Sequence, residues 1–143
     1  MSQWTHFLGV VRFDSLFLNV YPEPANKTRL AAAQVEKVHR LLQRGCVPMG
    51  SEGPIEFETV QTGRGPTVVI VGDLRDFGSD KDLQSVVDWL NQLTGEEREI
   101  GGWIRDAFVR CAVEFKEYKY ITINPDSGTF CLSDEMPSNF DDI

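Results

Sequence analysis

The chain has 143 residues, a length that suits one domain, and its 41% apolar and 25% charged residues are ordinary for a globular protein and argue against disorder. Its 14 basic and 22 acidic side chains give a net charge of −8, the wrong sign for neutralising phosphates, so direct nucleic-acid binding is not expected. Three scattered cysteines without a C-x-x-C pair encode neither a zinc knuckle nor a redox dithiol.

The chain begins without a secretion signal, and no run of about 20 apolar residues could cross a bilayer. We therefore expect a cytoplasmic protein without membrane contact, with a single domain over residues 1–132. Residues 133–143 are polar and acidic and predict a flexible tail. The acidic surplus favours solubility, and a surface that imitates nucleic acid or meets a basic partner is the alternative.

The first half of the chain predicts a strand, a helix and a hairpin. Residues 4–13 are rich in β-favouring side chains. Apolar residues recur at helical spacing from Lys27 to Arg44, and Gly45 supplies the left-handed residue that ends a helix. Residues 55–62 alternate apolar and acidic side chains, as in a strand with one wet face, whereas the β-branched run 67–71 predicts a central strand buried on both faces.

The second half predicts a helix followed by three strands. Ser79 is placed to cap a helix with the most regular apolar stripe in the chain, formed by Leu83, Val86, Val87, Leu90 and Leu93. Residues 103–105 suggest one helical turn. Residues 107–116 alternate as in a half-buried antiparallel strand, and residues 119–123 and 129–132 flank a Pro-Asp-Ser-Gly turn that closes a C-terminal hairpin.

The predicted order β-α-β-β-α-β indicates an α+β fold of the ferredoxin-like type. In that fold an antiparallel sheet carries two helices on one face, and here a C-terminal β-hairpin is added. Its two central strands are antiparallel, so Asp14 and Asp73, which follow those strands, should lie at opposite ends of the sheet. Many unrelated functions use this fold, so it indicates little about activity.

Carboxylates gather beside the predicted hairpin. Asp73 and Asp76 follow its second strand, Glu52 lies in the glycine-rich loop before it, and Arg75 lies between the two aspartates. Converging carboxylates are ligands for Mg²⁺ in phosphodiester chemistry, but this spacing matches no known metal motif. An arginine among carboxylates better fits an ion-pair network or a grip on a polar ligand. We therefore predict a binding cluster of Ser51, Glu52, Asp73, Arg75 and Asp76, with no catalytic residue, metal or cofactor.

Three other features allow two interpretations each. The loop 50–53 offers backbone amides to an anion, yet it enters a strand and lacks the Lys-Ser/Thr pair of a P-loop, so a tight turn is the simpler interpretation. His6 follows Thr5, but no H-x-T or H-x-S repeat occurs elsewhere, which excludes a two-histidine phosphoesterase; His6 and His39 are interpreted as half-exposed structural residues, with His39 facing outward. Five aromatic residues form either a surface that contacts a partner or a cover over the edge of the hydrophobic core. They are Trp4, Trp89, Trp103, Tyr118 and Tyr120.

Three sequence blocks stand out: Trp4-Thr5-His6 with Gly9-x-x-Arg12-x-Asp14, then Pro48-Met49-Gly50-Ser51-Glu52-Gly53, then Gly72-Asp73-Leu74-Arg75-Asp76. Together they resemble a family of small uncharacterised bacteriophage proteins. The resemblance implies a phage origin and no particular chemistry. It directs attention to the functions that such proteins serve, which are inhibition of host defence, virion assembly and nucleotide metabolism.

On these grounds we expect a non-enzymatic phage accessory protein that acts by binding a host protein or a small nucleotide signal, as a homo-oligomer. The sequence shows no activated nucleophile, metal motif or cofactor loop, which motivates this prediction. One alternative is a small metal-dependent phosphodiesterase or nucleotide hydrolase that uses Glu52, Asp73 and Asp76. Another is a structural or assembly component of the virion.

Overall fold

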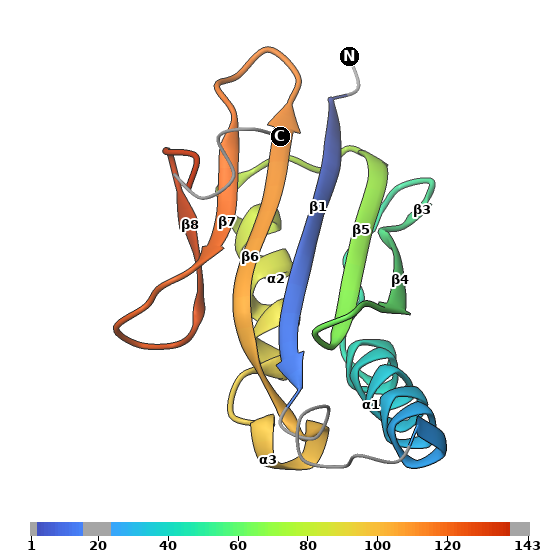
Figure 1. Ribbon diagram of the computed structural model, residues 1–143. Helices are drawn as coiled ribbons and strands as arrows, with labels where there is room; N and C mark the ends of the chain where they lie inside the picture. The colour runs from blue at the N-terminus through green and yellow to red at the C-terminus, as the bar shows by residue number, and fades with distance from the viewer. Residues whose placement is uncertain (1–2, 16–23, 138–143) are drawn as a thin grey trace.

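A computed structural model describes residues 3–15 and 24–137, with residues 24–28 described by their backbone alone. In this part of the chain an antiparallel sheet forms the body of the domain, with strand order β4-β5-β1-β6-β7-β8 (Figure 1). Its strands are β1 (Trp4–Ser15), β4 (Glu56–Gln61), β5 (Pro66–Arg75), β6 (Gly102–Val113), β7 (Lys119–Ile123) and β8 (Phe130–Ser133). The other elements are α1 (Pro24–Arg44), α2 (Asp80–Leu90), the 3-10 turn η1 (Asn91–Leu93), α3 (Glu97–Ile100), and a small hairpin of β2 (Met49–Gly50) and β3 (Gly53–Pro54).

The α+β class and the antiparallel sheet are confirmed, but the predicted ferredoxin-like element order is not matched. The β2-β3 hairpin comes between α1 and β4, and η1 and α3 separate α2 from β6. The predicted C-terminal hairpin is present as β7 and β8, and because β7 pairs with β6 it extends the sheet to six strands. Beyond β8, residues 138–143 of the predicted tail lie outside the described residues.

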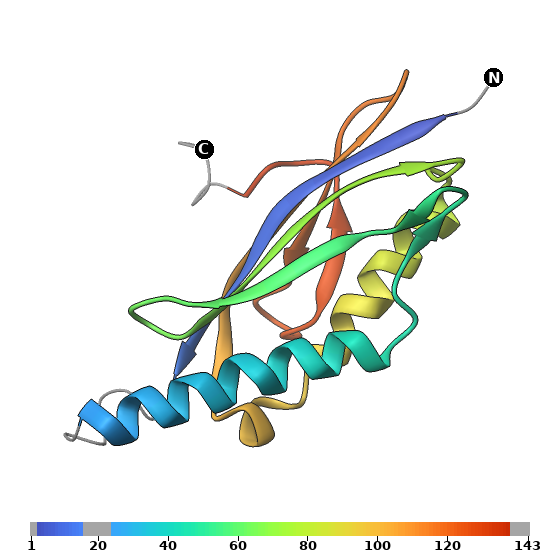
Figure 2. The ribbon, with the colours of Figure 1, turned by 90° about the vertical axis from the view of Figure 1, so that its right-hand side faces the viewer.

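The helices α1 and α2 lie on the same face of the sheet (Figure 2). All five residues of the predicted α2 stripe are buried, and from α1 the side chains of Val38 and Leu42 join them in the core. Ser79 caps α2 as predicted, and Asp82 completes a capping box with it. None of the described helices is long and apolar enough to cross a membrane.

The first strand lies at the centre of the sheet. It pairs with β5 from Trp4 to Arg12 and with β6 from Thr5 to Ser15. Gly9 makes this close pairing possible, because a Cβ atom there would lie 2.1 Å from the carbonyl oxygen of Phe108 in β6. A register shift after Arg12 keeps β6 paired with the end of β1, so residues 103–105 belong to a strand and the predicted helical turn there is wrong.

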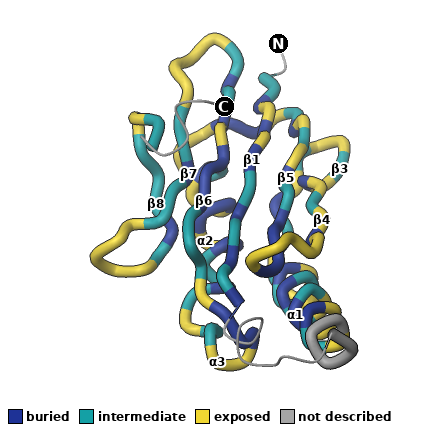
Figure 3. The backbone as a smooth tube through the Cα atoms, in the orientation of Figure 1, coloured by how far each residue is buried: buried dark blue, intermediate teal, exposed yellow. Residues whose placement is uncertain are grey.

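The face of the sheet opposite the helices is open. The prediction that β5 is buried on both faces is wrong, because Val68 and Ile70 are buried on the helix side whereas Val71 is 39% exposed on the other. β-Branched residues favour strands whether or not both faces are covered, so a continuous run did not distinguish the two cases. β4, at one end of the sheet, is mostly exposed (Figure 3).

Candidate functional site

Asp73 and Arg75 lie inside β5 and not after it, contrary to prediction. Residues 72–75 continue the antiparallel pairing with residues 4–7 of β1, which extends the strand beyond the β-branched run. Asp73 is paired with His6, and Arg75 with Trp4, on the open face. Asp76 begins the turn that follows, with a φ of 56°, and its N–H donates to the carbonyl of Gln3 at 2.7 Å.

The β2-β3 hairpin brings Ser51 and Glu52 to the end of β5. The N–H of Ser51 donates to the carbonyl of Arg75 at 2.9 Å, and the Arg75 guanidinium donates to the Glu52 carboxylate at 2.9 Å. Gly50 allows this approach, because a Cβ there would lie 2.7 Å from the Arg75 carbonyl oxygen. The structure therefore joins Ser51, Glu52 and Arg75 of the predicted cluster through a turn and an exposed ion pair.

The partner of Asp73 is His6, which sequence reasoning did not connect with the cluster. The His6 Nδ1 atom lies 2.5 Å from the Asp73 carboxylate, and both side chains are more than half exposed. Only the register of β1 against β5 brings them together, and no local sequence signal encodes that register. In this register, Trp4, Thr5 and His6 of the first block lie opposite Arg75, Leu74 and Asp73 of the third block.

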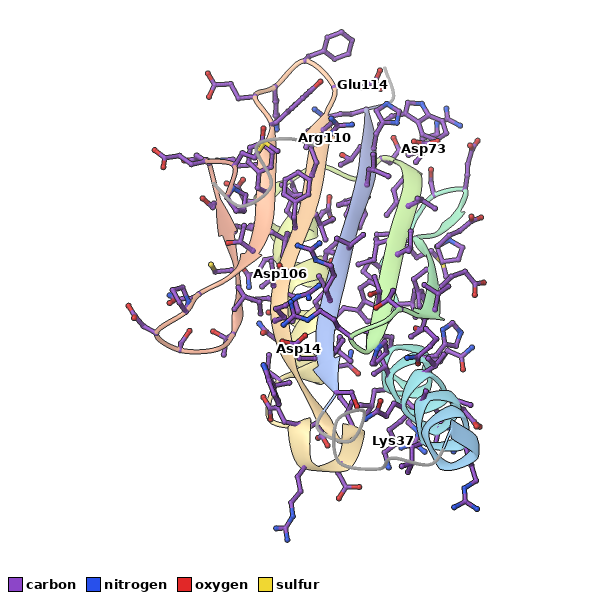
Figure 4. The ribbon with its side chains drawn as sticks, viewed as in Figure 1. Asp14, Lys37, Asp73, Asp106, Arg110 and Glu114 are labelled. Atoms are coloured by element: carbon purple, nitrogen blue, oxygen red, sulfur yellow. The ribbon has the colours of Figure 1, made fainter. Side chains whose placement is uncertain are left out.

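The other carboxylates are distributed along the sheet. Arg12 makes two hydrogen bonds of 2.6 Å to Asp106, and the Arg105 guanidinium lies 3.6 Å from the Asp14 carboxylate. Asp14 and Asp73 lie at opposite ends of the sheet, as predicted (Figure 4). Among the described residues, no three His, Cys, Asp or Glu side chains are grouped so that they could hold a metal ion.

The open face carries an apolar centre between these charged pairs. The cross-strand row Val71, Leu8, Arg110 and Tyr120 runs from β5 to β7, and Leu8 in its middle is 51% exposed. In the next row Val69, Val10 and Phe108 are neighbours, and the Phe108 ring stacks on Tyr120 at 5.8 Å. The Arg110 guanidinium lies 5.6 Å from the centre of the Tyr118 ring. Tyr118 and Tyr120 thus belong to an exposed surface.

Trp89 and His39 are both packed against other elements of the protein, which the sequence did not indicate. Trp89 is 1% exposed, and its indole N–H donates to the Leu42 carbonyl at 2.9 Å, so it belongs to the core. His39 does not face outward as predicted. Its Nδ1 lies 3.3 Å from Thr59 Oγ1 and its ring lies 4.8 Å from that of Phe57, so it joins α1 to β4.

Two hollows follow β4 along the end of the sheet. One, of about 610 Å³, lies between α1 and β4 and is lined by Val35, His39, Gln43 and Thr59 among others. The second, of about 560 Å³, continues towards the β2-β3 hairpin and includes Phe57. We call these two hollows and the strand between them the β4 groove. Strand order is decided by long-range pairing, so the sequence predicted the strand without showing that it lies at an edge.

Comparison of the chain with family models, curated proteins and solved structures gave no match. The resemblance to small phage proteins stays a prediction. Its three blocks nevertheless meet in space, because the first and third pair across β1 and β5 and the second packs against Arg75. They meet where residues 4–7 pair with residues 72–75, whereas Arg12 and Asp14 of the first block lie towards the opposite end of the sheet.

Proposed function

We propose that this chain acts by binding another protein through the open face of its sheet, and not by catalysis. The exposed apolar centre at Leu8, surrounded by charged pairs, is the observation that carries the proposal. Apolar cores with polar rims are typical of protein interfaces. Contiguous exposed apolar patches mark such interaction sites on soluble proteins. If the phage resemblance holds, the partner is a host protein, as in inhibition of host defence.

The charged residues of the predicted cluster support binding more than chemistry. The Glu52 carboxylate forms an ion pair with Arg75, and the Asp73 carboxylate lies 2.5 Å from the His6 Nδ1 atom, so both already have partners within the protein. In a hydrolase mechanism that uses Glu52, Asp73 and Asp76, these two contacts would compete with a metal ion for the carboxylate oxygens. A thermal shift series with Mg²⁺, Mn²⁺ and cyclic nucleotides tests this alternative together with sequestration of a nucleotide signal. Stabilisation by a metal that is lost in Asp73→Asn would favour the hydrolase.

Substitution of Leu8 tests the proposed interface. Leu8→Glu places a charge at the apolar centre, and Phe115→Glu is the matched control, because Phe115 is 84% exposed in the loop after β6. Both variants should keep the melting temperature of the parent within a few degrees, since each residue is exposed in the free chain. Affinity purification from bacterial cells that express each variant, followed by mass spectrometry, should recover one partner with the parent and with Phe115→Glu and lose it with Leu8→Glu.

Sedimentation velocity on the same three proteins shows whether the partner is a second copy. Concentration-dependent dimers that disappear only in Leu8→Glu would identify the open face as the homo-oligomer interface. A ring or filament would support the virion component instead. Equal recovery of partners by Leu8→Glu and the parent would contradict the proposal.

A further inference from the structure

We propose that the β4 groove binds an extended, basic segment of a partner protein, which adds to β4 as a further antiparallel strand. The inference rests on the proposed binding function, but it concerns the backbone edge of β4 and not the apolar centre at Leu8. The segment carries lysine or arginine at every second position and small or apolar residues between them.

The backbone of β4 is bare on its outer side. The N–H of Ile55 donates away from β5, to the carbonyl of Pro48 at 2.9 Å. Amide directions alternate along a strand, so the N–H and C=O groups of Phe57 and Thr59 also point away from β5. β4 is the last strand of its sheet, and no described backbone group pairs with this side of Phe57 or Thr59. An extended segment would satisfy these groups by strand addition.

The other edge of the same sheet is partly covered, at Phe130 of β8. In β8 the N–H of Phe130 donates to the side-chain oxygen of Asn91 at 2.8 Å, and the Asn91 amide donates to the Phe130 carbonyl at 3.3 Å. Covering an edge in this way is one means by which proteins prevent unwanted strand pairing. A side chain thus covers Phe130 of β8, whereas no described group covers the outer side of Phe57 or Thr59 of β4.

The groove has room for side chains on both sides of an added strand. On the helix side, the hollow of about 610 Å³ lies between α1 and β4. The hollow of about 560 Å³ reaches around the edge to Val69 and Val71 on the open face. Side chains of a strand alternate between its two faces, so successive residues of the segment would enter the two hollows in turn.

Charge determines what the segment carries on the open-face side. Glu56 and Glu58 are exposed on that side of β4, opposite Val71 and Val69 of β5. A smaller hollow of about 360 Å³ continues this acidic strip, with Glu52, Glu56 and Asp73 among its lining residues. Oppositely charged side chains directly across neighbouring strands stabilise the pair, and a net charge of −8 attracts basic segments from a distance.

The same carboxylates disfavour a second copy in the groove. Antiparallel pairing of β4 with itself, with Phe57 opposite Phe57 or opposite Thr59, would place a glutamate of one copy against a glutamate of the other. Like charges directly opposite destabilise a strand pair. In these two registers, Glu56 and Glu58 thus favour a basic partner over a second copy of the chain.

An acetylated and amidated peptide of alternating lysine and valine, about ten residues long, is the probe for this proposal. Its controls are a peptide of alternating glutamate and valine and a peptide with all lysines before all valines. Only the alternating lysine peptide should bind at low salt. Hydrogen exchange followed by NMR should show the Phe57 and Thr59 amides slowed by about tenfold or more on binding, while the amides of β8 are unchanged. Binding without protection of β4, or equal binding of the block peptide, would overturn the proposal.

Methylated peptides test the backbone contacts without altering the protein. In the antiparallel complex, residues that lie opposite Phe57 and Thr59 direct their amides at β4, whereas residues opposite Glu56 and Glu58 direct theirs away. N-methylation of the valines should therefore abolish binding, and N-methylation of the lysines should be tolerated. Equal affinity of the two methylated peptides would rule out strand addition.

Charge variants test the acidic strip. Glu56→Gln/Glu58→Gln should weaken binding of the lysine peptide by about tenfold, because it removes the carboxylates across from the added strand. Glu117→Gln/Glu135→Gln changes the net charge equally at exposed positions outside the groove and should have little effect. If both double variants weakened peptide binding equally, the effect would come from net charge alone, and a specific acidic site would be refuted. Leu8→Glu leaves β4 intact, so failure of the open-face interface and failure of the groove are separate results.

Discussion

Single charged residues on the open face are held in place by partners from another element. Arg12 is bound through two nitrogens to Asp106, and this hydrogen bonding raises the pKa of the guanidinium above its ordinary value, so it stays charged. Glu52 and Arg75 form the corresponding pair at the other end of the sheet. A bidentate contact such as that between Arg12 and Asp106 fixes the orientation of both side chains in addition to pairing their charges. The apolar side chains between them are left as the part of this face available to a partner.

Asp82 links stability to pH. Partial burial by itself raises its pKa, but hydrogen bonds from the Gly78 N–H and from Ser79 hold the pKa below its ordinary value. A lowered folded-state pKa stabilises the protein fully above the unfolded-state pKa of about 3.9, and this stabilisation is lost as the pH falls through the folded-state pKa. Asp82→Asn should therefore cost about 1 kcal/mol at pH 7 and progressively less below about pH 4.

Thermal unfolding measured at several pH values checks this prediction. Asp126→Asn, in the exposed turn between β7 and β8, serves as the control and should follow the parent at every pH. A difference between Asp82→Asn and the parent that stays constant down to about pH 2.5, well below the ordinary pKa of an aspartate, would show that the capping box is not the source.

The cysteines should differ in reactivity. Burial raises the pKa of the Cys111 thiol to about 12, whereas Cys46 is exposed. The thiolate is the reactive form, so iodoacetamide at about pH 8 should modify Cys46 in the folded protein and Cys111 only after unfolding. Peptide mass spectrometry over time measures both rates. Similar rates for the two residues in the native protein would contradict the buried position of Cys111.

Local signals predicted α2 and the short strand β7 well, but not the full length of β5. The spacing of apolar residues in α2 and the Ser79 cap both operate within a few residues, and both are confirmed. The end of β5 depends instead on pairing with residues 4–7 of β1, which no local pattern specifies. The same cause limited the site, since Ser51, Glu52 and Arg75 were placed together correctly whereas His6 and the β4 edge were missed.

Contact between β1 and β6 depends on Gly9. Gly9→Ala would force the two strands apart, because the added Cβ meets the backbone of Phe108 and Val109. We expect a loss of about 1–3 kcal/mol of unfolding free energy, as in other overpacked interiors. Gly63→Ala is the matched control, since a Cβ atom at Gly63 would meet nothing within 4 Å. Urea denaturation of both variants measures the difference in unfolding free energy. Equal stability of the two variants would show that β1 and β6 can accommodate a Cβ atom at position 9.

On the scale of the whole molecule, the sheet divides the domain into two unlike sides. One side is closed by α1 and α2, whose apolar residues fill the core. The other side has the exposed Leu8 at its centre, and the bare edge of β4 borders both sides. The two proposed contact surfaces are therefore contiguous, and a large partner would have access to both. A partner that used both at once would gain affinity because the second contact becomes intramolecular.

The central position of β1 also affects how the chain folds as it is made. β1 is synthesised before both of its neighbours, and the later of the two, β6, ends about 100 residues after it. At about 5–20 residues per second, the ribosome needs roughly 5–20 seconds to supply that neighbour. During this interval β1 has at least one unpaired edge, and unpaired edges are prone to aggregation. The nascent chain therefore depends on translation speed and on chaperones more than a fold with a peripheral first strand would.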